Sequence, residues 1–372
     1  MKKIAYVRAT NIFDDSRATK ELLTLISAGY HVTVFGWGRN EQAASLCKKV
    51  FKNAEEKMDF HFFPKPLAAG IGIKNIDKLI AWFRWVYSSL KKNGEFDAVH
   101  ACNLDAGLGA YRYCKKYNIP LIYDIYDYYI DSHAIPPLLA NTVEKMEINI
   151  INHAKVTIIC TAERKEQIAK ATPQKVIVLH NSPDVEKIEV PNCRYDYAYC
   201  GSLGHKRLLS EMFGEYKNNS DLTFAVAGYG DYTETVSRLS EEFENFSFSG
   251  TIPYDQVLQT ESEARILSAI YQPTIRNHRL CAPNKFYEAL ALAKPLIVCR
   301  GTGIDRIVEQ NNIGMVIDYN AEEFYSALRT LLADPDKCRE MGERARKIYE
   351  KEYRWPIMAD RLLETYQQLF RL

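Results

Sequence analysis

Short apolar runs alternate with segments of helical periodicity along most of this chain. The runs have the length of strands, and their nearly continuous apolar character is typical of strands buried on both faces of a sheet. Because consecutive parallel strands need a crossover between them, this alternation predicts a doubly wound parallel sheet of the α/β class. In the first half, the predicted strands span residues 4–7, 31–35, 98–100, 121–123, 156–160 and 176–179.

The strand pattern stops near residue 180 and restarts near residue 197, which indicates a second sheet. The intervening segment, 181–192, is polar and contains Pro183 and Pro191, a composition typical of an interdomain linker. At 372 residues the chain is long enough for two domains of ordinary size. We therefore predict one domain over residues 1–181 and a second over 182–356. The predicted strands of the second domain span residues 197–201, 223–228, 266–271, 296–299 and 314–317.

The composition favours a globular protein of a reducing compartment. No run of 18 apolar residues exists, so no membrane-spanning helix is expected. The first apolar run is interrupted by Arg8 too early for a signal peptide. The nine cysteines show no Cys-x-x-Cys spacing, which predicts reduced thiols of a cytosolic protein and neither a zinc site nor a disulfide framework.

The two halves of the chain carry opposite net charge. Residues 1–180 hold 25 Lys and Arg against 18 Asp and Glu, a net charge of +7, and the remainder carries −6. A basic half predicts contact with an anionic substrate or surface. Nucleic acid is the other candidate partner, but we find no basic arm, zinc finger or aromatic RNA-binding signature, so no nucleic acid is expected.

The segment 283–295 is the most informative about function. A proline opens it, a helical run follows, and an apolar run closes it, which predicts a loop, a helix and a buried strand. Asn284 and Lys285 lie at the helix start, where free N–H groups and the helix dipole favour an anion. Glu288, one turn further, can accept hydrogen bonds from a vicinal diol such as a ribose. A nucleotide pocket is therefore predicted, with an ordinary capped helix as the alternative.

This segment, in the form Pro-Asn-Lys-x-x-Glu, resembles the donor-binding motif of GT-B glycosyltransferases, especially those of family four. Three further loops, at 199–207, 228–231 and 248–253, resemble the family's diphosphate turn, its Gly-x-Gly turn and its base-binding loop. The resemblance covers nearly the whole chain and implies two Rossmann-like domains that face a central cleft. In the diphosphate turn we favour Lys206, with Arg207 close behind. The donor residues that the resemblance implies are Gly201, Ser202, Gly204, Lys206, Arg207, Gly228, Gly230, Thr251, Ile252, Asn284, Lys285 and Glu288.

One position departs from the family's pattern. The usual motif has a second glutamate eight residues before the ribose-binding one, where it contacts the transferred sugar, and here that position is Leu280. Recognition of the donor sugar must then use other groups of the same loop, and we expect Asn277 and His278 to lie nearby. A solvated polar loop is the alternative for both residues.

In the first domain, polar side chains follow a predicted strand. His100 ends that strand and is followed by Asn103 and Asp105, and ligands of open α/β sheets bind beyond the carboxyl ends of strands. The segment resembles the family's Asp-x-x-His-x-His-x pattern, with Cys102 in place of the second histidine.

The next predicted strand ends in a loop of three carboxylates and four tyrosines, residues 123–131. It resembles the family's Asp-x-His-Asp loop, with Tyr126 in place of the histidine, and tyrosine rings suit contact with sugars. We expect Asp124 to be structural and Asp127 to lie in the acceptor site. Arg17 belongs to a segment that resembles the family's Asp-x-Arg signature and is expected to orient the cleft or an acceptor phosphate. The predicted catalytic residues are His100, Asp105 and Asp127, and the predicted acceptor-binding residues are Arg17, Asn103 and Tyr126.

Enzymes of family four retain the anomeric configuration of the transferred sugar, and the resemblance implies retention here. Lys206, Arg207 and Lys285 would stabilise the negative charge that develops on the leaving diphosphate. We see no Asp-x-Asp that would hold a metal, so neither a metal nor another cofactor is expected. In the family the last helix crosses back onto the first domain, so residues 357–372 are expected to pack there. Two consecutive helices of the second domain are the alternative.

A predicted helix that ends near residue 92 carries one apolar stripe. On its opposite side Trp82 and Trp85 fall among lysines that include Lys74 and Lys78, as in helices that lie at a membrane surface. With the basic first half, this pattern predicts peripheral contact with an anionic membrane through Trp82 and Trp85. Burial of both rings under a neighbouring loop is the alternative.

Together these features predict a retaining glycosyltransferase that moves a sugar from a nucleotide-diphosphate sugar to a glycan or polyprenyl-diphosphate-linked acceptor. The expected pathway is the biosynthesis of a bacterial capsule, exopolysaccharide or O-antigen, in the cytoplasm or at the inner face of the membrane. A nucleotide-sugar 2-epimerase of the same layout is one alternative, which would need no acceptor loop. A non-catalytic nucleotide-sugar-binding partner protein is another, to which Leu280 gives limited support.

Overall fold

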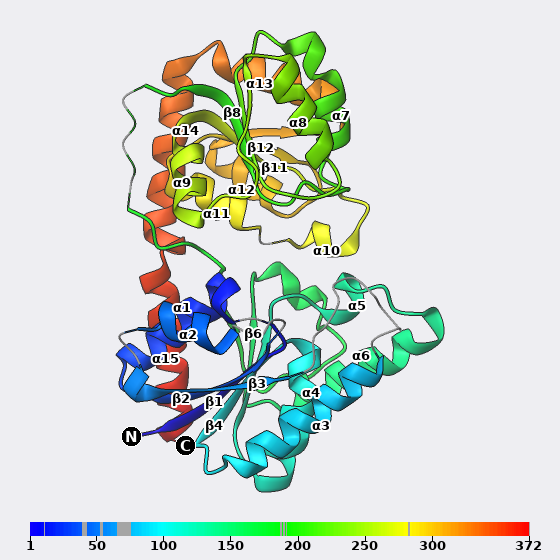
Figure 1. The fold of residues 1–372 in the computed structure, drawn as a ribbon, viewed down its shortest axis with the longest axis vertical. Coiled ribbons are helices and arrows are strands. Elements are labelled where there is room, and N and C mark those ends of the chain that lie inside the picture. Colours follow the sequence, from blue (N-terminus) through cyan, green and yellow to red (C-terminus); the bar gives the residue numbers. More distant parts are fainter. Residues whose placement is uncertain are drawn as a thin grey trace. The chain divides into compact units, whose positions relative to one another are not determined.

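The computed structural model describes residues 1–10, 12–38, 43–52, 55–64, 76–186, 188, 190, 192–281 and 283–371. Lys74 and Pro191, which enter the predictions above, lie outside the described residues. The chain divides into two compact units, one made of Met1–His180 with Met358–Leu372 and the other of Asn181–Ile357 (Figure 1). The last helix therefore begins in the second unit, and its larger part belongs to the first.

The first unit is built on a parallel sheet. Its described strands follow the order β3-β2-β1-β4-β5-β6-β7, and every neighbouring pair runs parallel. The strands are β1 (Lys3–Arg8), β2 (His31–Trp37), β3 (Met58–Phe63), β4 (Ala98–Cys102), β5 (Leu121–Ile125), β6 (Val156–Ile159) and β7 (Val176–Val178). The helices are α1 (Ser16–Ser27), α2 (Ala43–Val50), α3 (Ile76–Lys92), α4 (Asn103–Tyr117), α5 (Tyr129–Ser132), α6 (Pro137–His153) and most of α15 (Trp355–Arg371).

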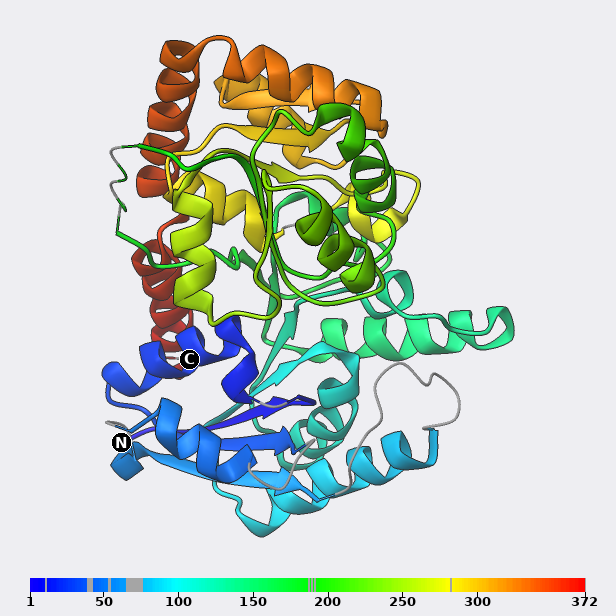
Figure 2. The same cartoon turned by 45° about the horizontal axis from the view of Figure 1, so that its top comes forward.

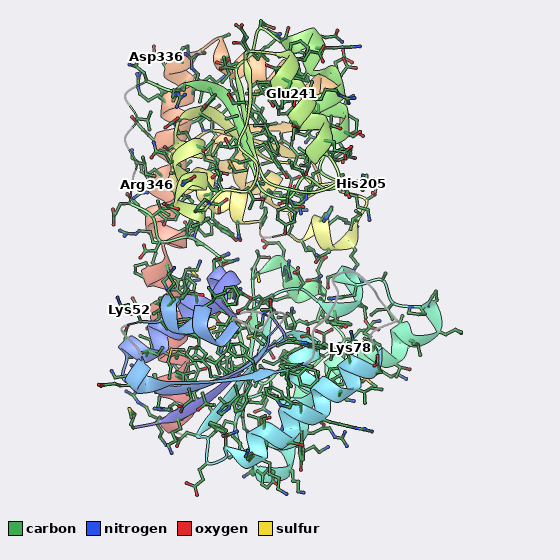
Figure 3. The ribbon with its side chains drawn as sticks, in the orientation of Figure 1. Lys52, Lys78, His205, Glu241, Asp336 and Arg346 are labelled. Atoms are coloured by element: carbon green, nitrogen blue, oxygen red, sulfur yellow. The ribbon has the colours of Figure 1, made fainter. Side chains whose placement is uncertain are left out.

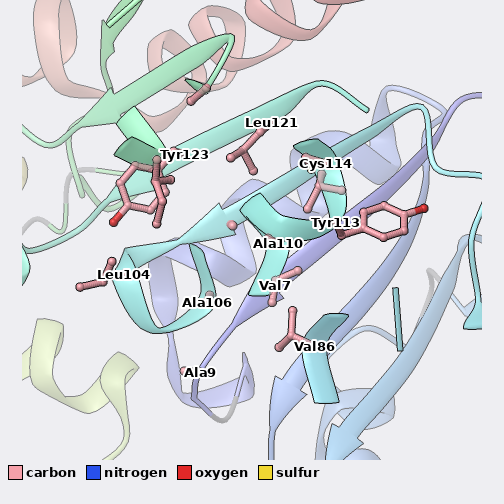
Figure 4. Close-up of a cluster of buried hydrophobic side chains, with 14 of the residues drawn as sticks. Val7, Ala9, Val86, Leu104, Ala106, Ala110, Tyr113, Cys114, Leu121 and Tyr123 are labelled. Carbon is pink, nitrogen blue, oxygen red and sulfur yellow. The ribbon is translucent and has the colours of Figure 1, made fainter. Parts of the chain in front are cut away.

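Alternating side chains of these strands bury two different faces of the sheet. Val7 of β1 packs with residues of α3, α4 and β5 on one face, in the cluster drawn in Figure 4. Tyr6, its neighbour, points to the other face and donates a hydrogen bond to Glu21 of α1 (2.8 Å). On that same face His100 of β4 contacts Tyr366 of α15 (2.9 Å). The sheet is thus covered by α3, α4 and α6 on one side and by α1 and α15 on the other.

The second unit repeats this plan. Its described strands follow the order β10-β9-β8-β11-β12-β13, again all parallel. The strands are β8 (Tyr195–Cys200), β9 (Phe224–Ala227), β10 (Phe246–Phe248), β11 (Ala264–Ala269), β12 (Leu296–Cys299) and β13 (Gly314–Ile317). The helices are α7 (Leu209–Glu215), α8 (Thr233–Glu242), α9 (Tyr254–Ser262), α10 (Arg276–Arg279), α11 (Asn284–Ala291), α12 (Ile304–Asn311), α13 (Ala321–Leu332) and α14 (Pro335–Ile348).

Helices cover both faces of this second sheet (Figures 1 and 2), and an apolar cluster lies under each layer of helices. Tyr197 and Tyr199 of β8 pack with α7, α8 and α13. Ala198, between them in sequence, packs with α9, α11 and α12. The large side chains on one face and small ones on the other let α11 lie close to the sheet, which matters because α11 carries predicted donor residues.

Each sheet reverses its direction of growth beside its first strand, since β1 lies between β2 and β4, and β8 lies between β9 and β11. Ligands of such sheets bind beyond the carboxyl ends of the strands at this reversal. The prediction of two Rossmann-like parallel sheets is confirmed. The strands β3 and β10 were not predicted, because β3 interrupts its apolar residues with Asp59 and His61 and β10 has only three residues.

The prediction that Trp82 and Trp85 form an exposed face for membrane contact is wrong. Trp82 has no exposed surface; its ring stacks on Trp37 (5.2 Å between centres) and Trp85 (5.3 Å). Trp85 is half-buried and also packs against Phe63 at 5.6 Å. The two rings fill the space between α3 and the first strands, so they belong to the core. No helix in the described part of the chain is long and apolar enough to cross a bilayer.

We predict that Trp82→Ala destabilises the first unit by about 3–5 kcal/mol, because it empties a large packed volume. It also removes the donor of the hydrogen bond from Trp82 Nε1 to the carbonyl of Asp105 (2.9 Å). Urea unfolding followed by circular dichroism measures the change. Arg84→Ala, an exposed change on the same helix, should stay within about 0.5 kcal/mol. Equal stability of the two variants would contradict the core position of Trp82.

A second prediction concerns Glu147 of α6, which is fully buried and accepts hydrogen bonds from the Tyr123 hydroxyl (2.8 Å) and the Tyr129 backbone N–H (3.1 Å). Burial raises the pKa of Glu147 to about 7. Between pH 4.5 and 7 the folded chain therefore binds more protons than the unfolded chain, and its stability falls as pH rises.

Replacing this carboxyl group with the neutral amide of Glu147→Gln removes the cost of charging it. The variant should gain stability relative to wild type as pH rises from 5 to 8, by up to about 3 kcal/mol. Denaturant titrations at both pH values measure the trend. The exposed change Glu163→Gln is the control, and a Glu147→Gln difference that is the same at pH 5 and pH 8 would refute the argument.

Candidate functional site

Glycine turns meet beyond the carboxyl ends of β8 and β9 in the second unit. The N–H of Gly201 donates to the carbonyl of Ala227 (2.8 Å), and that of Gly228 donates to the carbonyl of Gly250 (2.7 Å). Gly201 and Gly228 have φ of 141° and 140°, and a Cβ on Gly228 would lie 1.8 Å from the carbonyl oxygen of Gly201. Since only glycine allows this approach, the predicted phosphate turn is a closely packed backbone surface.

Lys285, in the first turn of α11, extends its ammonium group over this turn. A Cβ on Gly201 would lie 2.8 Å from Lys285 Nζ, and Nζ is 4.4 Å from the centre of the Tyr199 ring. Burial opposes the charged form of the lysine. The Tyr199 hydroxyl and the carboxyl groups of Glu261 and Glu288 outweigh burial and raise the pKa of this lysine. An ammonium group whose charged form is favoured, beside a glycine turn and a helix N-terminus, is suited to hold a phosphate.

Glu288 lies one turn further along α11 and is only 5% exposed. Its Oε1 accepts a hydrogen bond from the Tyr254 hydroxyl at 3.0 Å, which orients the carboxylate. Glu261 of α9 is a second buried carboxyl group, and burial together with the charge of Glu288 raises its pKa well above the usual range. Two buried carboxyl groups, Glu261 and Glu288, are thus close enough to interact with each other and with Lys285.

The loop after β8 is joined to α10. The carbonyl of Lys206, an exposed residue, accepts a hydrogen bond from the N–H of Gln272 at 3.1 Å. The Arg207 guanidinium lies over the Tyr271 ring, 5.2 Å from its centre. The ring of His278 meets the same tyrosine edge-on at 5.3 Å. Arg207 and His278, both predicted donor residues, are thus placed around one tyrosine.

The other predicted donor residues lie in the same loops. Asn284 opens α11, and its Oδ1 accepts a hydrogen bond from Asn181 Nδ2 at 2.8 Å. His205, labelled in Figure 3, connects the β8 loop with the β9 loop, because its Nε2 is 3.4 Å from the Asp231 carboxylate. Of the remaining residues, Ser202, Gly230 and Thr251 are exposed, and Gly204, Ile252 and Asn277 are half-buried.

In the first unit, Asn103 connects the loops that follow β4 and β5. Its Oδ1 accepts hydrogen bonds from the backbone N–H groups of Tyr126 (2.9 Å) and Asp127 (3.4 Å). Asp105, in the first turn of the same helix, is half-buried, and burial raises its pKa. The Asp127 side chain is 47% exposed and pairs with Arg164 at 3.1 Å. Four predicted residues therefore gather at the carboxyl ends of two neighbouring strands.

Two guanidinium groups lie against the ring of Tyr126. The Cζ atoms of Arg8 and Arg17 are 4.2 Å and 4.5 Å from the ring centre, and the Tyr126 hydroxyl is 3.0 Å from that of Tyr6. Arg8, the last residue of β1, also binds Asp15 through Nε at 2.9 Å. Its side chain is 15% exposed. The sequence analysis missed this cation, although its position directly after an apolar strand is the signal that marks it.

Two predicted site residues lie inside the first unit. Arg17, 1% exposed, donates to both oxygens of Asp124 (2.7 and 2.9 Å) and to Glu21 (2.9 Å). His100 has no exposed surface; its Nδ1 is 2.9 Å from the Tyr366 hydroxyl and its Nε2 is 3.5 Å from Asp124. Because neither side chain reaches solvent, the direct substrate contacts expected of Arg17 and His100 do not fit this geometry. Both residues hold α1, β4, β5 and α15 together.

One group of metal-ligating atoms occurs among the described residues, formed by His100, Cys102 and Asp124 within 4.8 Å of one another. Arg17 already neutralises Asp124, so a cation there would meet an opposing positive charge. The sequence does contain one Asp-x-Asp, at 334–336, but the first of these carboxylates caps α14. Neither position offers an open metal site beside the predicted donor residues.

The sequence analysis also failed to predict Glu261 and Tyr366, for a reason that differs from the one for Arg8. Glu261 closes α9 and Tyr366 lies in the last helix, and both reach a site by packing against elements distant in sequence. The local sequence pattern around each residue cannot predict such contacts.

Two family models match the chain in succession. Residues 19–187 match the one described as glycosyltransferase family 4, and residues 206–364 match the one described as glycosyl transferase-like. The alpha-maltose-1-phosphate synthase of Mycolicibacterium smegmatis is 29% identical over 89 residues, which are 22% of this chain and 23% of that protein. The GDP-mannose-dependent alpha-(1-6)-phosphatidylinositol monomannoside mannosyltransferase of Mycobacterium tuberculosis is 24% identical over 148 residues, 37% of each chain. The matched part thus spans less than half of either relative.

Solved structures match over the whole chain. The sucrose-phosphate synthase of Thermosynechococcus elongatus superposes with a TM-score of 0.76 at 15% identity and covers 100% of both chains. HepE of Anabaena, solved with UDP-glucose, gives 0.71 at 14% identity and covers 99% of this chain and 100% of that one. At these identities the likeness concerns the fold alone. Glycosyltransferase models thus match both halves of the chain in succession, and the two parallel sheets share the fold of these GT-B glycosyltransferase structures.

Proposed function

We propose that this protein is a retaining glycosyltransferase that moves a sugar from a nucleotide-diphosphate sugar to a glycan or polyprenyl-diphosphate-linked acceptor. The observation that carries the proposal is the start of α11, where a buried ammonium group and a buried carboxylate, Lys285 and Glu288, stand one turn apart beside the Gly201 turn. The chemistry of this pair suits a diphosphate and a ribose diol. Biosynthesis of a bacterial surface polysaccharide is the setting we propose.

On the donor side, Lys285 and Arg207 would bind the diphosphate, with Lys206 at the exposed rim of the same loop. The Gly228 and Gly230 turn would approach the phosphates through its backbone, and Thr251 and Ile252 would contact the base. Asn277 and His278 would face the transferred sugar, since Leu280 offers no carboxylate. Two relatives support a nucleotide-sugar donor by their names, one being GDP-mannose-dependent and one solved with UDP-glucose.

On the acceptor side, we assign contact with the acceptor to the exposed or half-buried groups Asp105, Asp127 and Tyr126, which Asn103 holds in place. Arg8, beside Asp105 and Tyr126, joins them. His100 and Arg17 become positioning residues, because they are buried beneath this group. The assignment differs from the one based on sequence, in which His100 contacted the substrate directly.

The proposed reaction retains configuration by front-face displacement. The acceptor oxygen bonds to the anomeric carbon on the face that the diphosphate leaves, the carbon–oxygen bond to the diphosphate breaks, and the hydroxyl proton passes to the departing phosphate. Most of the catalytic effect would come from positioning the two substrates and from the fixed positive charges of Lys285 and Arg207, which stabilise the leaving group. A cytoplasmic location is part of the proposal, and nine cysteines that form no disulfide support it.

The test of the activity is to incubate the full chain with a panel of nucleotide sugars and a bacterial lipid extract. Release of nucleoside diphosphate together with a product whose mass has grown by one sugar unit is the expected result. Isomerised nucleotide sugar without transfer would support a 2-epimerase instead. Donor binding with neither product would support a non-catalytic binding protein.

Glu288→Gln should lower the affinity for the nucleoside diphosphate at least about tenfold. Hydrogen bonds to a charged group contribute about 1.5–3 kcal/mol, and each 1.4 kcal/mol is about tenfold in affinity. The amide oxygen can still accept from Tyr254, so the fold should be kept. Calorimetric titration measures the loss, and Glu241→Gln, an exposed change on α8 (Figure 3), is the matched control. Unchanged binding by the Glu288 variant would remove this residue from the site.

Transfer should continue in excess EDTA, because the proposed charge clamp consists of Lys206, Arg207 and Lys285. Initial rates measured with and without the chelator should agree within about twofold. Loss of transfer that magnesium or manganese restores would reveal a metal requirement and overturn this part of the mechanism.

A further inference from the structure

The second unit contains a cavity of about 700 Å³ that is separate from the proposed donor site. Its wall includes Cys193, just before β8, Arg265 at the start of β11, and Lys294, just before β12. All three lie at the amino ends of parallel strands. Proposed donor residues follow the carboxyl ends of β8 and β11, so the cavity lies at the opposite edge of the sheet.

One wall of the cavity is fixed by close packing of α14. A Cβ on Gly342 would lie 2.0 Å from the carbonyl oxygen of Ala293, so the helix rests directly on the turn that carries Lys294. The Ala293 backbone itself has φ of 57°, a conformation that a residue other than glycine adopts only when its surroundings impose it. In Figure 3, α14 runs between the labelled Asp336 and Arg346. The cavity is therefore bounded by a constrained turn and a packed helix.

Positive charge dominates the lining of the cavity. Lys294 is half-buried, and the acceptor found for its ammonium group is the thiol of Cys193 at 3.5 Å. A neutral thiol is a weak acceptor, and burial lowers the pKa of this lysine. Arg265 and Arg339 add two exposed cations, which pair with Asp196 (3.9 Å) and Asp336 (2.8 Å) outside the lining. Glu343 is the one carboxylate among the described lining residues. An incoming anion would supply the strong acceptor that the ammonium group lacks.

The rest of the lining is mainly apolar, with Leu292, Pro295 and Leu331 beside the charged groups. A volume of this size is typical of sites that bury a small organic molecule, where apolar walls hold the body and a few polar groups hold the head. We propose that this cavity is a second binding site, for a small organic anion whose phosphate or carboxylate head pairs with Lys294.

The cavity and the proposed donor site share the helix α11. Lys285 and Glu288 lie toward its start, and its carboxyl end leads into the cavity wall, where the N–H of Lys294 donates to the carbonyl of Ala289 (2.9 Å). A ligand that draws Lys294 into the cavity acts directly on the end of this helix. We therefore infer that occupancy of the cavity changes the affinity of the donor site, an inference that rests on the proposed function. The two binding events would then be coupled reciprocally.

Direct titration of the full chain tests the site itself. Phenyl phosphate and benzoate serve as probes, since they carry the two anionic heads on one apolar ring, and phenol and inorganic phosphate are the controls. At least one probe should bind in calorimetry at least about tenfold tighter than either control. Lys294→Met should weaken that binding at least about tenfold, whereas Lys347→Met, an exposed change on α14, should leave it unchanged.

The location of the bound probe is tested separately. Alkylation of Cys193 by iodoacetamide, followed by mass spectrometry of the digested wild-type chain, should slow at least threefold when the probe is bound. This readout needs no variant, so it stands even if Lys294→Met fails to fold. Binding that Lys285→Met abolishes and Lys294→Met preserves would place the probe in the donor site and overturn the proposal. Absence of binding by both probes would overturn it as well.

Coupling is tested by titrating a nucleoside diphosphate with and without saturating probe. A shift in affinity of at least threefold, lost in Lys294→Met, is expected. An unchanged affinity overturns the coupling and leaves the cavity site standing. A chain that binds no nucleoside diphosphate at all contradicts the proposed function, while the cavity is judged by the probe titrations alone.

Discussion

Buried positive charge is the constraint that organises both units of this protein. A cation removed from water must find acceptors inside the protein, because an uncompensated buried charge is very costly. Arg17 finds them completely in Asp124, Glu21 and a backbone carbonyl. Although burial opposes ionisation of Asp124, the guanidinium group lowers the pKa of that carboxyl. The ion pair thereby joins α1 to β5, and His100 extends it to α15.

The ammonium groups of Lys285 and Lys294, in the second unit, have fewer strong acceptors than Arg17 has. We use this difference to distinguish structural cations from candidate ligand-binding cations. Lys285 has a tyrosine face and two carboxyl groups around it, but its ammonium group also lies over a glycine turn that offers only backbone. Lys294 has a thiol. A cation whose N–H groups all have strong acceptors holds structural elements together, whereas a cation with N–H groups left over can bind an anionic ligand. By this criterion Arg17 is a structural residue and Lys294 is a candidate ligand-binding residue.

The sheets could be predicted because a parallel strand buried on both faces needs apolar residues at nearly every position. Asn103, Asp127 and Gly201 could be placed at site edges for a related reason, since parallel topology gathers the carboxyl ends of strands at one edge. Helical periodicity gave the wrong prediction for Trp82. It placed this ring in solvent, whereas the ring stacks on Trp37 and Trp85. It failed for Tyr366 and Glu261 because contacts between distant helices depend on packing that no local pattern encodes.

The position of α11 explains how one short helix would contribute to both proposed sites. Alanines of β8, β9 and β11 on its face of the sheet let it pack closely, and Gly342 lets α14 close over the turn at its end. A helix of eight residues held on both sides has little room to bend, so we expect a displacement at its carboxyl end to reach Glu288 in its middle and Lys285 near its start. The tight packing that would orient Lys285 and Glu288 for the proposed donor would therefore also make them respond to a ligand bound in the cavity.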